Sequence, residues 1–517
     1  MEKRPPKLRE ILALTFLGLV LLPAVPALAA EPPMLQSAGL RADVAVLRRA
    51  YEAMHPGLYR YNTRAQMDRN FARLEAAFGR DRSLSDAYLE LSRFLAKVKC
   101  GHSYANFFNQ PEAVVDSLFK GQNRVPFYFR WIDRRMIVTR NFSTDSRISR
   151  GTEILSIDGV PASRILDRLL TVARADGAND AKRIKYLELT GDSPYEAFDI
   201  FFPLLFPPAG DSREFTVREF GTKAVAKLRL RSLTFEERAA PLEAEEKARK
   251  GGDEPLWRLE HLDSDTAYLR MKSWAVYDSK WDWKGFLDRS LDELSKRATR
   301  NLVVDLRGNE GGLDCGDQII SRLIDADLPL GQYRRLVRYR TAPEDLVPYL
   351  DTWDPSFRDW GAAAVGPEHG FYTLRRYDDD ERGSVIAAKG PRYVGRVYVL
   401  IDAANSSATF QFAQVLKQHR LATLVGQPTG GNQRGINGGA FFFLRLPNSK
   451  VEVDLPLIGT FPIGRRPDAG ITPDVVVRPS VRDIAQGIDT ELAAVRRLIE
   501  ERSSLTSRTK ERRRQEP

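Results

Sequence analysis

The stretch VVDLRGNEGG at residues 303–312 changes abruptly from an apolar run to small and polar residues. A second stretch, IDAANSSATF at residues 401–410, does the same further along the chain, and each is followed by a helical pattern. Parallel sheets present chemistry at their strand ends in this way. The first stretch offers glycine amides as oxyanion donors, and the second offers a serine at a strand-to-helix turn. Either alone is compatible with an ordinary βα turn, whereas together they favour a serine hydrolase.

Length and composition predict a multidomain globular protein. The 517 residues exceed what one core usually organises, which suggests roughly two to four domains. Hydrophobic residues make up 43% of the chain and charged residues 29%, as in ordinary globular proteins. The net charge of +10 comes in good part from the N-terminal segment and the C-terminal tail. Because no basic stripe is interleaved with aromatic residues, a solvated tail explains the charge better than nucleic-acid binding, and we expect no nucleic-acid partner.

The N-terminus predicts an export signal. Basic residues precede an apolar run at 11–22, and the small residues at 27–30 offer a cleavage site. That run is short for a membrane span, no later stretch is long and apolar enough to cross a bilayer, and the region holds no cysteine that a lipid could modify. We therefore expect residues 1–30 to be removed and the mature protein, with no integral membrane segment, to be periplasmic or extracellular.

Residues 31–115 are expected to form a helical N-terminal domain. Apolar side chains recur at helical spacing from residue 41 to residue 54, where a His-Pro-Gly sequence stops the run. Asn62 or Thr63 can cap a second helix, and Ser83 can cap a third.

The third of these helices is expected to run out at residues 99–103. Gly101 in this turn is suited to the left-handed backbone conformation that often ends helices. His102 is thereby placed at a helix exit, from which its side chain can project.

Residues 116–240 are expected to form a second, mixed domain, because short β-type runs separated by turn residues replace the helical pattern. The charged segment 243–253 fits an exposed linker better than an element of a core. The β-type runs lie at 126–131, 136–140, 153–157 and 215–230, with a helical stretch at 162–174.

Alternating β-type and helical runs in residues 255–500 predict a third domain built on a mainly parallel βαβ sheet. A stretch rich in prolines, aromatics and charges at 341–389 indicates an insertion, and a last helix at about 481–499 precedes a basic tail, 501–517. The strands are expected at 266–272, 301–306, 397–401 and 422–425, the helices at 283–298, 318–324 and 408–419, and a hairpin at 441–446 and 450–457.

These motifs resemble the tail-specific, or C-terminal processing, serine peptidases and their tricorn-core relatives. The resemblance implies an α/β multidomain fold: an N-terminal helical domain, a PDZ-like β-rich domain and a ClpP/crotonase-like catalytic α/β domain. Five motifs occur in the family's order and together span most of the chain after the signal. They are GTEILSIDG at 151–159, DLRGNEGG at 305–312, VLIDAANSSATF at 399–410, ATLVGQPTGG at 422–431 and GITPD at 470–474.

The resemblance implies that Ser407 is the nucleophile, since SATF at 407–410 aligns with the family's Ser-Ala-Ser-Glu motif. The ordinary alternative is that Ser406 and Ser407 only cap the helix that follows, which is a common use of serine. The family match favours Ser407 as nucleophile and leaves Ser406 as a candidate for the cap.

The general base is expected to be His102. In the processing branch of the family the base is a lysine in a Gly-Lys-Gly turn, but that position here is Asn432, whose amide cannot accept the serine proton. The tricorn-like branch takes a histidine from the N-terminal region, in a Gly-His motif that CGHS at 100–103 resembles. Of the five histidines only His102 has this context; His55 is kept as an outside candidate, and the others are expected to be ordinary residues.

A third group should orient the imidazole and stabilise its protonated form. The family's histidine branch has a glutamate at a position that is Pro467 here, and Asp468 is the adjacent acid. We assign the role to Asp468; the one-residue offset leaves open that the acid lies elsewhere or that only a dyad operates. Asp474 fits a cap or turn.

The oxyanion hole is expected to use the backbone amides of Gly311 or Gly312 together with that of Ala408. A tight turn without catalytic use is the ordinary reading of such glycines, and both can hold. Cys100 and Cys315 flank the proposed base and the oxyanion loop, so they can be either a disulfide or two free thiols.

The expected function is that of an exported serine-type endopeptidase that cleaves polypeptides through a Ser-His-(Asp) acyl-enzyme mechanism. No metal or cofactor is expected, because no His/Cys/Asp cluster has ligand spacing. The resemblance also implies that the PDZ-like domain binds an extended chain at a sheet edge. The alternatives are a non-catalytic peptide-binding protein with a degenerate peptidase domain, and an esterase-like hydrolase using the same site.

Overall fold

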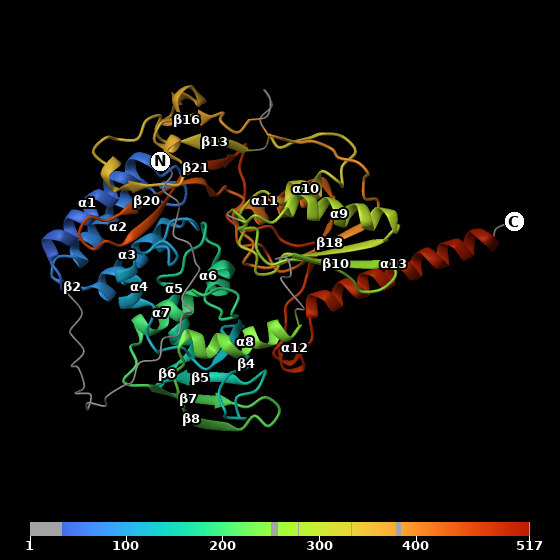
Figure 1. Cartoon of the computed structure of the whole chain (residues 1–517), viewed down its shortest axis with the longest axis horizontal. Coiled ribbons are helices and arrows are strands. Elements are labelled where there is room, and N and C mark those ends of the chain that lie inside the picture. The colour runs from blue at the N-terminus through green and yellow to red at the C-terminus, as the bar shows by residue number, and fades with distance from the viewer. Residues whose placement is uncertain (1–33, 250–256, 278, 332, 379–383, 516–517) are drawn as a thin grey trace, which may run out of the picture.

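The computed structural model describes residues 34–249, 257–277, 279–331, 333–378 and 384–515 (Figure 1). The expected signal segment, residues 1–30, lies outside them. Among the described residues, no helix combines the length and the apolar character that crossing a membrane requires.

The helices expected near the N-terminus are present. Thr63 forms a capping box with Gln66, and Ser83 accepts a hydrogen bond from the Asp86 N–H, so both expected caps are made. The helices are α1 (Ser37–Met54), α2 (Arg64–Ala77), α3 (Leu84–Val98) and α4 (Glu112–Leu118).

The end of α3 differs from the expectation. Lys99, with φ of 60°, takes the left-handed conformation, and Gly101 does not. Glycine is needed at 101 for another reason: its N–H donates to Asp176 Oδ1 over 2.9 Å, and a Cβ there would lie 2.8 Å from Asp176 Oδ2. The close approach of Asp176 therefore selects Gly101.

The next region contains a sheet in the order β3-β4-β5-β7-β8, with β6 (Val160–Pro161) paired to β5. All of these neighbours are antiparallel. The strands are β3 (Phe127–Ile132), β4 (Arg135–Asn141), β5 (Glu153–Ile157), β7 (Ser212–Arg218) and β8 (Val225–Arg231), and the helices are α5 (Ala162–Leu170), α6 (Asp180–Tyr186) and α7 (Ala197–Leu205).

The prediction of a linker at 243–253 is wrong for its first part, because helix α8 (Phe235–Arg249) extends to residue 249. Thr234 and Glu237 form the reciprocal hydrogen bonds of a capping box before a run of good helix formers. The charged pattern was assigned to a linker, although it also suits a helix. Residues 250–253 lie outside the described residues.

The βαβ alternation forms a six-stranded sheet in the order β22-β19-β18-β11-β10-β9. Every neighbouring pair is parallel except β9 and β10. Helices α9 (Trp283–Lys296), α10 (Gly316–Ile320) and α11 (Ser407–His419) share one core with one face of the sheet, and the start of α13 packs on the other face (Figure 1). The strands are β9 (Trp257–His261), β10 (Thr266–Met271), β11 (Asn301–Asp305), β18 (Arg396–Ile401), β19 (Thr423–Gly426) and β22 (Val475–Val476).

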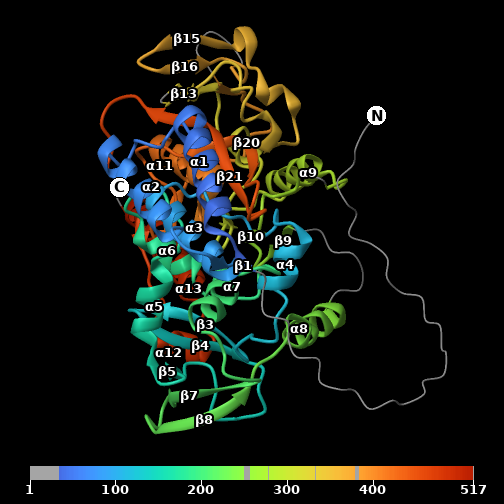
Figure 2. The same ribbon diagram turned by 90° about the vertical axis from the view of Figure 1, so that its left-hand side faces the viewer.

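The expected insertion contributes to a second six-stranded sheet, in the order β14-β20-β21-β13-β16-β15, in which all neighbours are antiparallel. The expected hairpin, β20 and β21, lies beside α1 and joins the core of the N-terminal helices (Figure 2). The strands are β13 (Tyr333–Val337), β14 (Leu350–Asp351), β15 (Ala364–Glu368), β16 (Phe371–Leu374), β20 (Asn437–Arg445) and β21 (Glu452–Pro462).

The single C-terminal helix expected at 481–499 is two helices, α12 (Val481–Gln486) and α13 (Thr490–Gln515). Gly487, with φ of 68°, ends the first in the left-handed conformation. Much of the expected basic tail continues α13 and projects from the body of the protein (Figure 1).

Candidate active site

The two stretches that end β11 and β18 meet at one edge of the parallel sheet. The strands are direct neighbours, with Asp305 opposite Leu400, so their carboxyl ends coincide. The buried Asn405 side chain donates to the Leu306 and Asn309 carbonyls over 2.6 and 3.0 Å, which ties one loop to the other. The hydrogen bonds set the glycine loop against the start of α11.

Ser407 is the first residue of α11 and has a φ of 51°. A left-handed conformation at a residue other than glycine costs about 1–3 kcal/mol and is typical of functional turns. Its side chain is partly exposed, and its hydroxyl makes no hydrogen bond within the described parts of the chain. Ser406 occupies the N-cap position, but its hydroxyl donates to the Glu310 carbonyl at 3.1 Å and makes no cap bond.

Gly311 touches the turn that carries Ser407. A Cβ at this position would lie 2.7 Å from Ser406 O and 2.9 Å from Ser407 Cβ, and its φ of 104° also demands glycine. The Gly311 N–H donates to Asn309 Oδ1 over 3.0 Å and is therefore occupied in this conformation. The amides of Gly312 and of Ala408, in the first turn of α11, remain as the oxyanion donors among those expected.

His102 lies in the turn after α3 and is partly exposed. Its ring packs 5.8 Å from the ring of Phe441, and its Nε2 faces Gly438, where a Cβ would be 3.8 Å away. Its Nδ1 is buried and has no hydrogen-bond partner among the described residues.

Charge around His102 favours its neutral form. Burial, with a smaller effect of the cations Arg174 and Lys182, lowers the pKa of His102 to about 4 against the opposing charge of Glu310. At neutral pH the imidazole is therefore unprotonated, as a general base must be. Glu310, whose charge acts on His102, immediately precedes Gly311, the glycine beside Ser407.

His55 has no nitrogen free for catalysis. Its Nδ1 accepts from the Gly57 N–H at 3.1 Å, so Nε2 carries the hydrogen and donates to Ser103 Oγ at 2.9 Å. Burial lowers the pKa of His55 to about 3. His55 is thus a structural partner of the segment that carries His102.

Asn432, at the position of the lysine in the processing branch, is fully buried and cross-links chain segments. Its side chain donates to Asp468 Oδ1 over 2.7 Å and to the Asp176 carbonyl over 3.2 Å. Asp468 Oδ1 also accepts from the Ala178 N–H at 2.9 Å. Within the described contacts, Asp468 binds these groups and not the His102 ring.

Lys182 of α6 is a site residue that sequence reasoning missed. Only 2% of its side chain is exposed, and its Nζ lies 2.6 Å from Glu310 Oε1, 2.9 Å from the Ala404 carbonyl and 3.4 Å from Ser406 Oγ. Burial lowers the pKa of Lys182, and Glu310 opposes that shift. The lysine connects α6 to both loops of the site.

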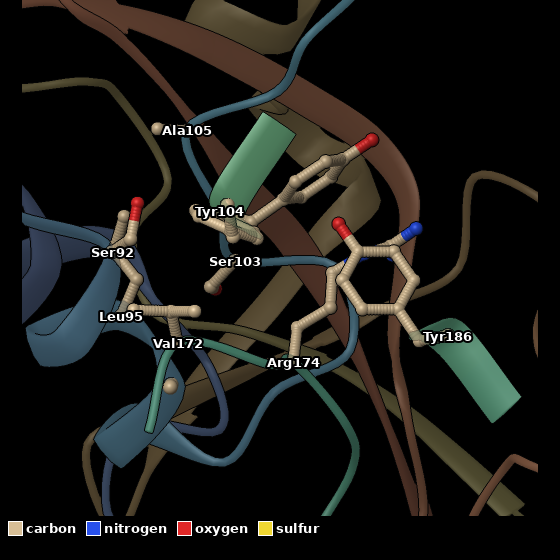
Figure 3. Close-up of a pocket in the computed structure, with 10 residues that line it drawn as sticks. Ser92, Leu95, Ser103, Tyr104, Ala105, Val172, Arg174 and Tyr186 are labelled. Atoms are coloured by element: carbon tan, nitrogen blue, oxygen red, sulfur yellow. The ribbon is translucent and has the colours of Figure 1, made fainter. Parts of the chain in front are cut away.

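Arg174 holds the other oxygen of the same carboxylate. Its Nη2 is 3.0 Å from Glu310 Oε2, and its guanidinium lies 4.0 and 4.9 Å from the ring centroids of Tyr104 and Tyr186. Figure 3 shows Arg174 beside these two rings at the wall of a small cavity. Glu310 is therefore held by two cations, and their charges lower its pKa to about 2 against the effect of burial.

Both cysteines are free and buried. The Cys100 sulfur accepts a hydrogen bond from Asn437 Nδ2 at 3.3 Å, while Cys315 lies in the core of the parallel sheet. Among the described residues, no group of three or more His, Cys, Asp or Glu could hold a metal ion.

Comparison with known proteins finds a family match for part of the chain. Residues 265–477 match peptidase family S41. The structure is similar to that of mature CPAF complexed with lactacystin, with a TM-score of 0.59 and 15% identity over 87% of this chain and 95% of that chain. It is also similar to mature CPAF, with a TM-score of 0.57 and 16% identity over 87% of this chain and 94% of that chain. No curated protein matches the sequence.

These similarities confirm the expected α/β multidomain fold with PDZ-like and catalytic parts. The matched range 265–477 includes Ser407, the glycine loop and Asp468. It excludes His102, which the CGHS motif suggested, and Lys182, which the three-dimensional arrangement places beside Ser406.

Proposed function

We propose that this chain is a serine-type endopeptidase in which Ser407 is the nucleophile and His102 the general base. The match of residues 265–477 to peptidase family S41 and the similarity of the fold to that of CPAF support the proposal. One observation carries the proposal: Gly311 contacts the strained Ser407 turn, and the preceding Glu310 interacts electrostatically with His102. These observations support a site in which Ser407, the neutral imidazole of His102 and the amides of Gly312 and Ala408 act together.

The proposed reaction follows acyl transfer. His102 takes the proton of the Ser407 hydroxyl as Oγ attacks the peptide carbonyl carbon, and the oxyanion accepts hydrogen bonds from the Ala408 and Gly312 amides. The C–N bond breaks as His102 returns the proton to the leaving amine. Water then gives a proton to His102 and attacks the acyl carbon. The ester bond to Ser407 Oγ breaks as His102 returns that proton to Oγ, which releases the new carboxyl end and regenerates Ser407.

Two carboxylates are candidates for supporting the imidazolium. Asp468 remains the proposed orienting group, and a turn of the His102 ring or a shift of its loop on substrate binding would have to bring the two together, as apo geometry is often loose. Glu310 is the acid whose charge already acts on His102. We propose that Glu310 supplies electrostatic support whichever acid orients the ring.

The pH dependence of acylation follows from the low pKa of His102. Since only neutral imidazole accepts a proton, the rate of labelling by a fluorophosphonate should fall as pH drops through about 4, and not through the ordinary value of 6.5. Glu310→Gln removes an anion and should move this limb to lower pH. Lys182→Met removes a cation and should move it to higher pH. Labelling rates between pH 3.5 and 8 are measured for the parent chain and the two variants. If the rate fell near pH 6.5 in all three proteins, the assignment of His102 as the base would be contradicted.

Export is also proposed, on the signal-like N-terminal sequence. Expressed with its own N-terminus in a Gram-negative host, the protein should be recovered from the periplasm or the medium with an N-terminus close to residue 31. Intact-mass analysis of the recovered chain measures this, and a cytoplasmic protein that begins at Met1 would contradict it.

A further inference from the structure

Three aromatic side chains form a series of ring contacts that begins at His102, and they have no part in the proposed mechanism. The Phe441 ring, 5.8 Å from the imidazole, is 5.9 Å from the Trp353 ring, and the Phe443 ring is 5.7 Å from Trp353. We call Trp353, Phe441 and Phe443 the aromatic group. It extends from the general base to the surface.

The fold determines how the group is assembled. Phe441 and Phe443 alternate with Phe442 along β20 and therefore share the face opposite to that buried residue. Strand β14 pairs Asp351 with Phe443, which brings the loop that follows β14 to this face. That loop carries Trp353.

Trp353 is held in place yet remains exposed. Its ring makes an edge contact with the buried Phe357 at 5.4 Å, which supports it from the protein side. The residue is nevertheless 58% exposed. Exposure of a large aromatic ring to water is unfavourable, and exposed aromatic rings are a common feature of binding surfaces.

We propose that the aromatic group is a substrate subsite for a bulky apolar or aromatic side chain of the polypeptide. The inference rests on the proposed function, because its position is defined by contact with the general base. An extended chain advances about 3.3 Å per residue, so the occupant lies within about four residues of the bond that is cleaved.

The test compares variants that remove the ring of Trp353 or that of Phe443. Trp353→Ala and Phe443→Ala should lower the ratio of kcat/KM for peptides with phenylalanine over those with alanine, at one position near the scissile bond, about tenfold. Trp353→Phe, which keeps an aromatic ring, should retain most of that ratio. Phe441 is left unchanged because it contacts His102.

Phe220→Ala is the matched control, since this phenyl is 42% exposed in the turn between β7 and β8. It should leave the ratio unchanged. Fluorophosphonate labelling of Ser407, which needs no peptide subsite, is measured on every variant and should equal that of the parent chain.

The outcomes separate this inference from the function on which it rests. Normal labelling with an unchanged phenylalanine-to-alanine ratio in Trp353→Ala and Phe443→Ala would overturn the subsite alone. A parent chain that is neither labelled nor proteolytic would overturn the proposed function, and the subsite with it. A reduced ratio that Trp353→Phe restores would support the proposal.

Discussion

Replacing Ser407 with alanine is expected to abolish proteolysis, with a loss of kcat of roughly a millionfold, as when the nucleophile of a serine hydrolase is removed. The acyl-enzyme cannot form without the Ser407 hydroxyl. No other described hydroxyl combines the left-handed turn, the contact with Gly311 and the free Ala408 amide beside it. Fluorophosphonate labelling should be lost in the same variant. Hydrolysis of an unstructured protein and intact-mass analysis after labelling measure the two effects.

Ser406→Ala is the matched control, because the neighbouring serine has the same chemistry in a different environment. Its hydroxyl donates to the Glu310 carbonyl and lies near Lys182, so its loss should cost about 0.5–1.5 kcal/mol of stability. Labelling should persist within about tenfold. If labelling disappeared in Ser406→Ala but survived in Ser407→Ala, Ser406 would be the nucleophile and Ser407 would not.

The same experiment addresses the alternative functions. A degenerate, peptide-binding protein would be folded but neither labelled nor proteolytic in its parent form. An esterase would lose small-ester turnover in Ser407→Ala, yet its parent form would leave unstructured proteins intact. The Asn432 position does not decide between them, because its buried amide has a structural use in either case.

The catalytic sheet could be predicted because its signals are local. Apolar runs that end in VVDLRGNEGG and IDAANSSATF became the adjacent strands β11 and β18, and Ser407 starts the helix that follows the second. Strand period, helix caps and turn residues act over a few positions, which a sequence shows directly. The strands inside 341–389 were not foreseen because their partners lie outside the local sequence: β14 pairs with the distant β20, and β16 pairs with β13.

The electrostatic part of the site could not be predicted. Lys182 lies in the charged run AKRIKY, a pattern typical of a solvated helix face, and is buried only because α6 packs on both loops of the site. Glu310 was read as part of a glycine loop, although its ion pairs with Lys182 and Arg174 depend on a fold that joins distant segments. Gly101 was recognised as special for the wrong reason, since tertiary contact with Asp176 decides it.

His102→Ala is expected to lower kcat at neutral pH by about 10⁴ to 10⁶ and to remove rapid labelling of Ser407, because no proton acceptor then activates the hydroxyl. His55→Gln is the control. His55 is bonded to Gly57 and Ser103, so its replacement should lower the melting temperature while the folded fraction still labels. Melting temperature and labelling rate are measured on the same samples.

The acids can be assigned by the same measurement. If Asp468 orients the imidazole, Asp468→Asn should lower kcat about 10⁴-fold at every pH, as for an amide in place of a triad aspartate. Glu310→Gln should act differently, since its carboxylate is held by Arg174 and Lys182 and influences His102 through charge. A shift of the acidic limb to lower pH in Glu310→Gln, beside a pH-independent loss in Asp468→Asn, would give the two carboxylates separate roles. If labelling survived in His102→Ala and vanished in a stably folded His55→Gln, the base would have to be reassigned to His55.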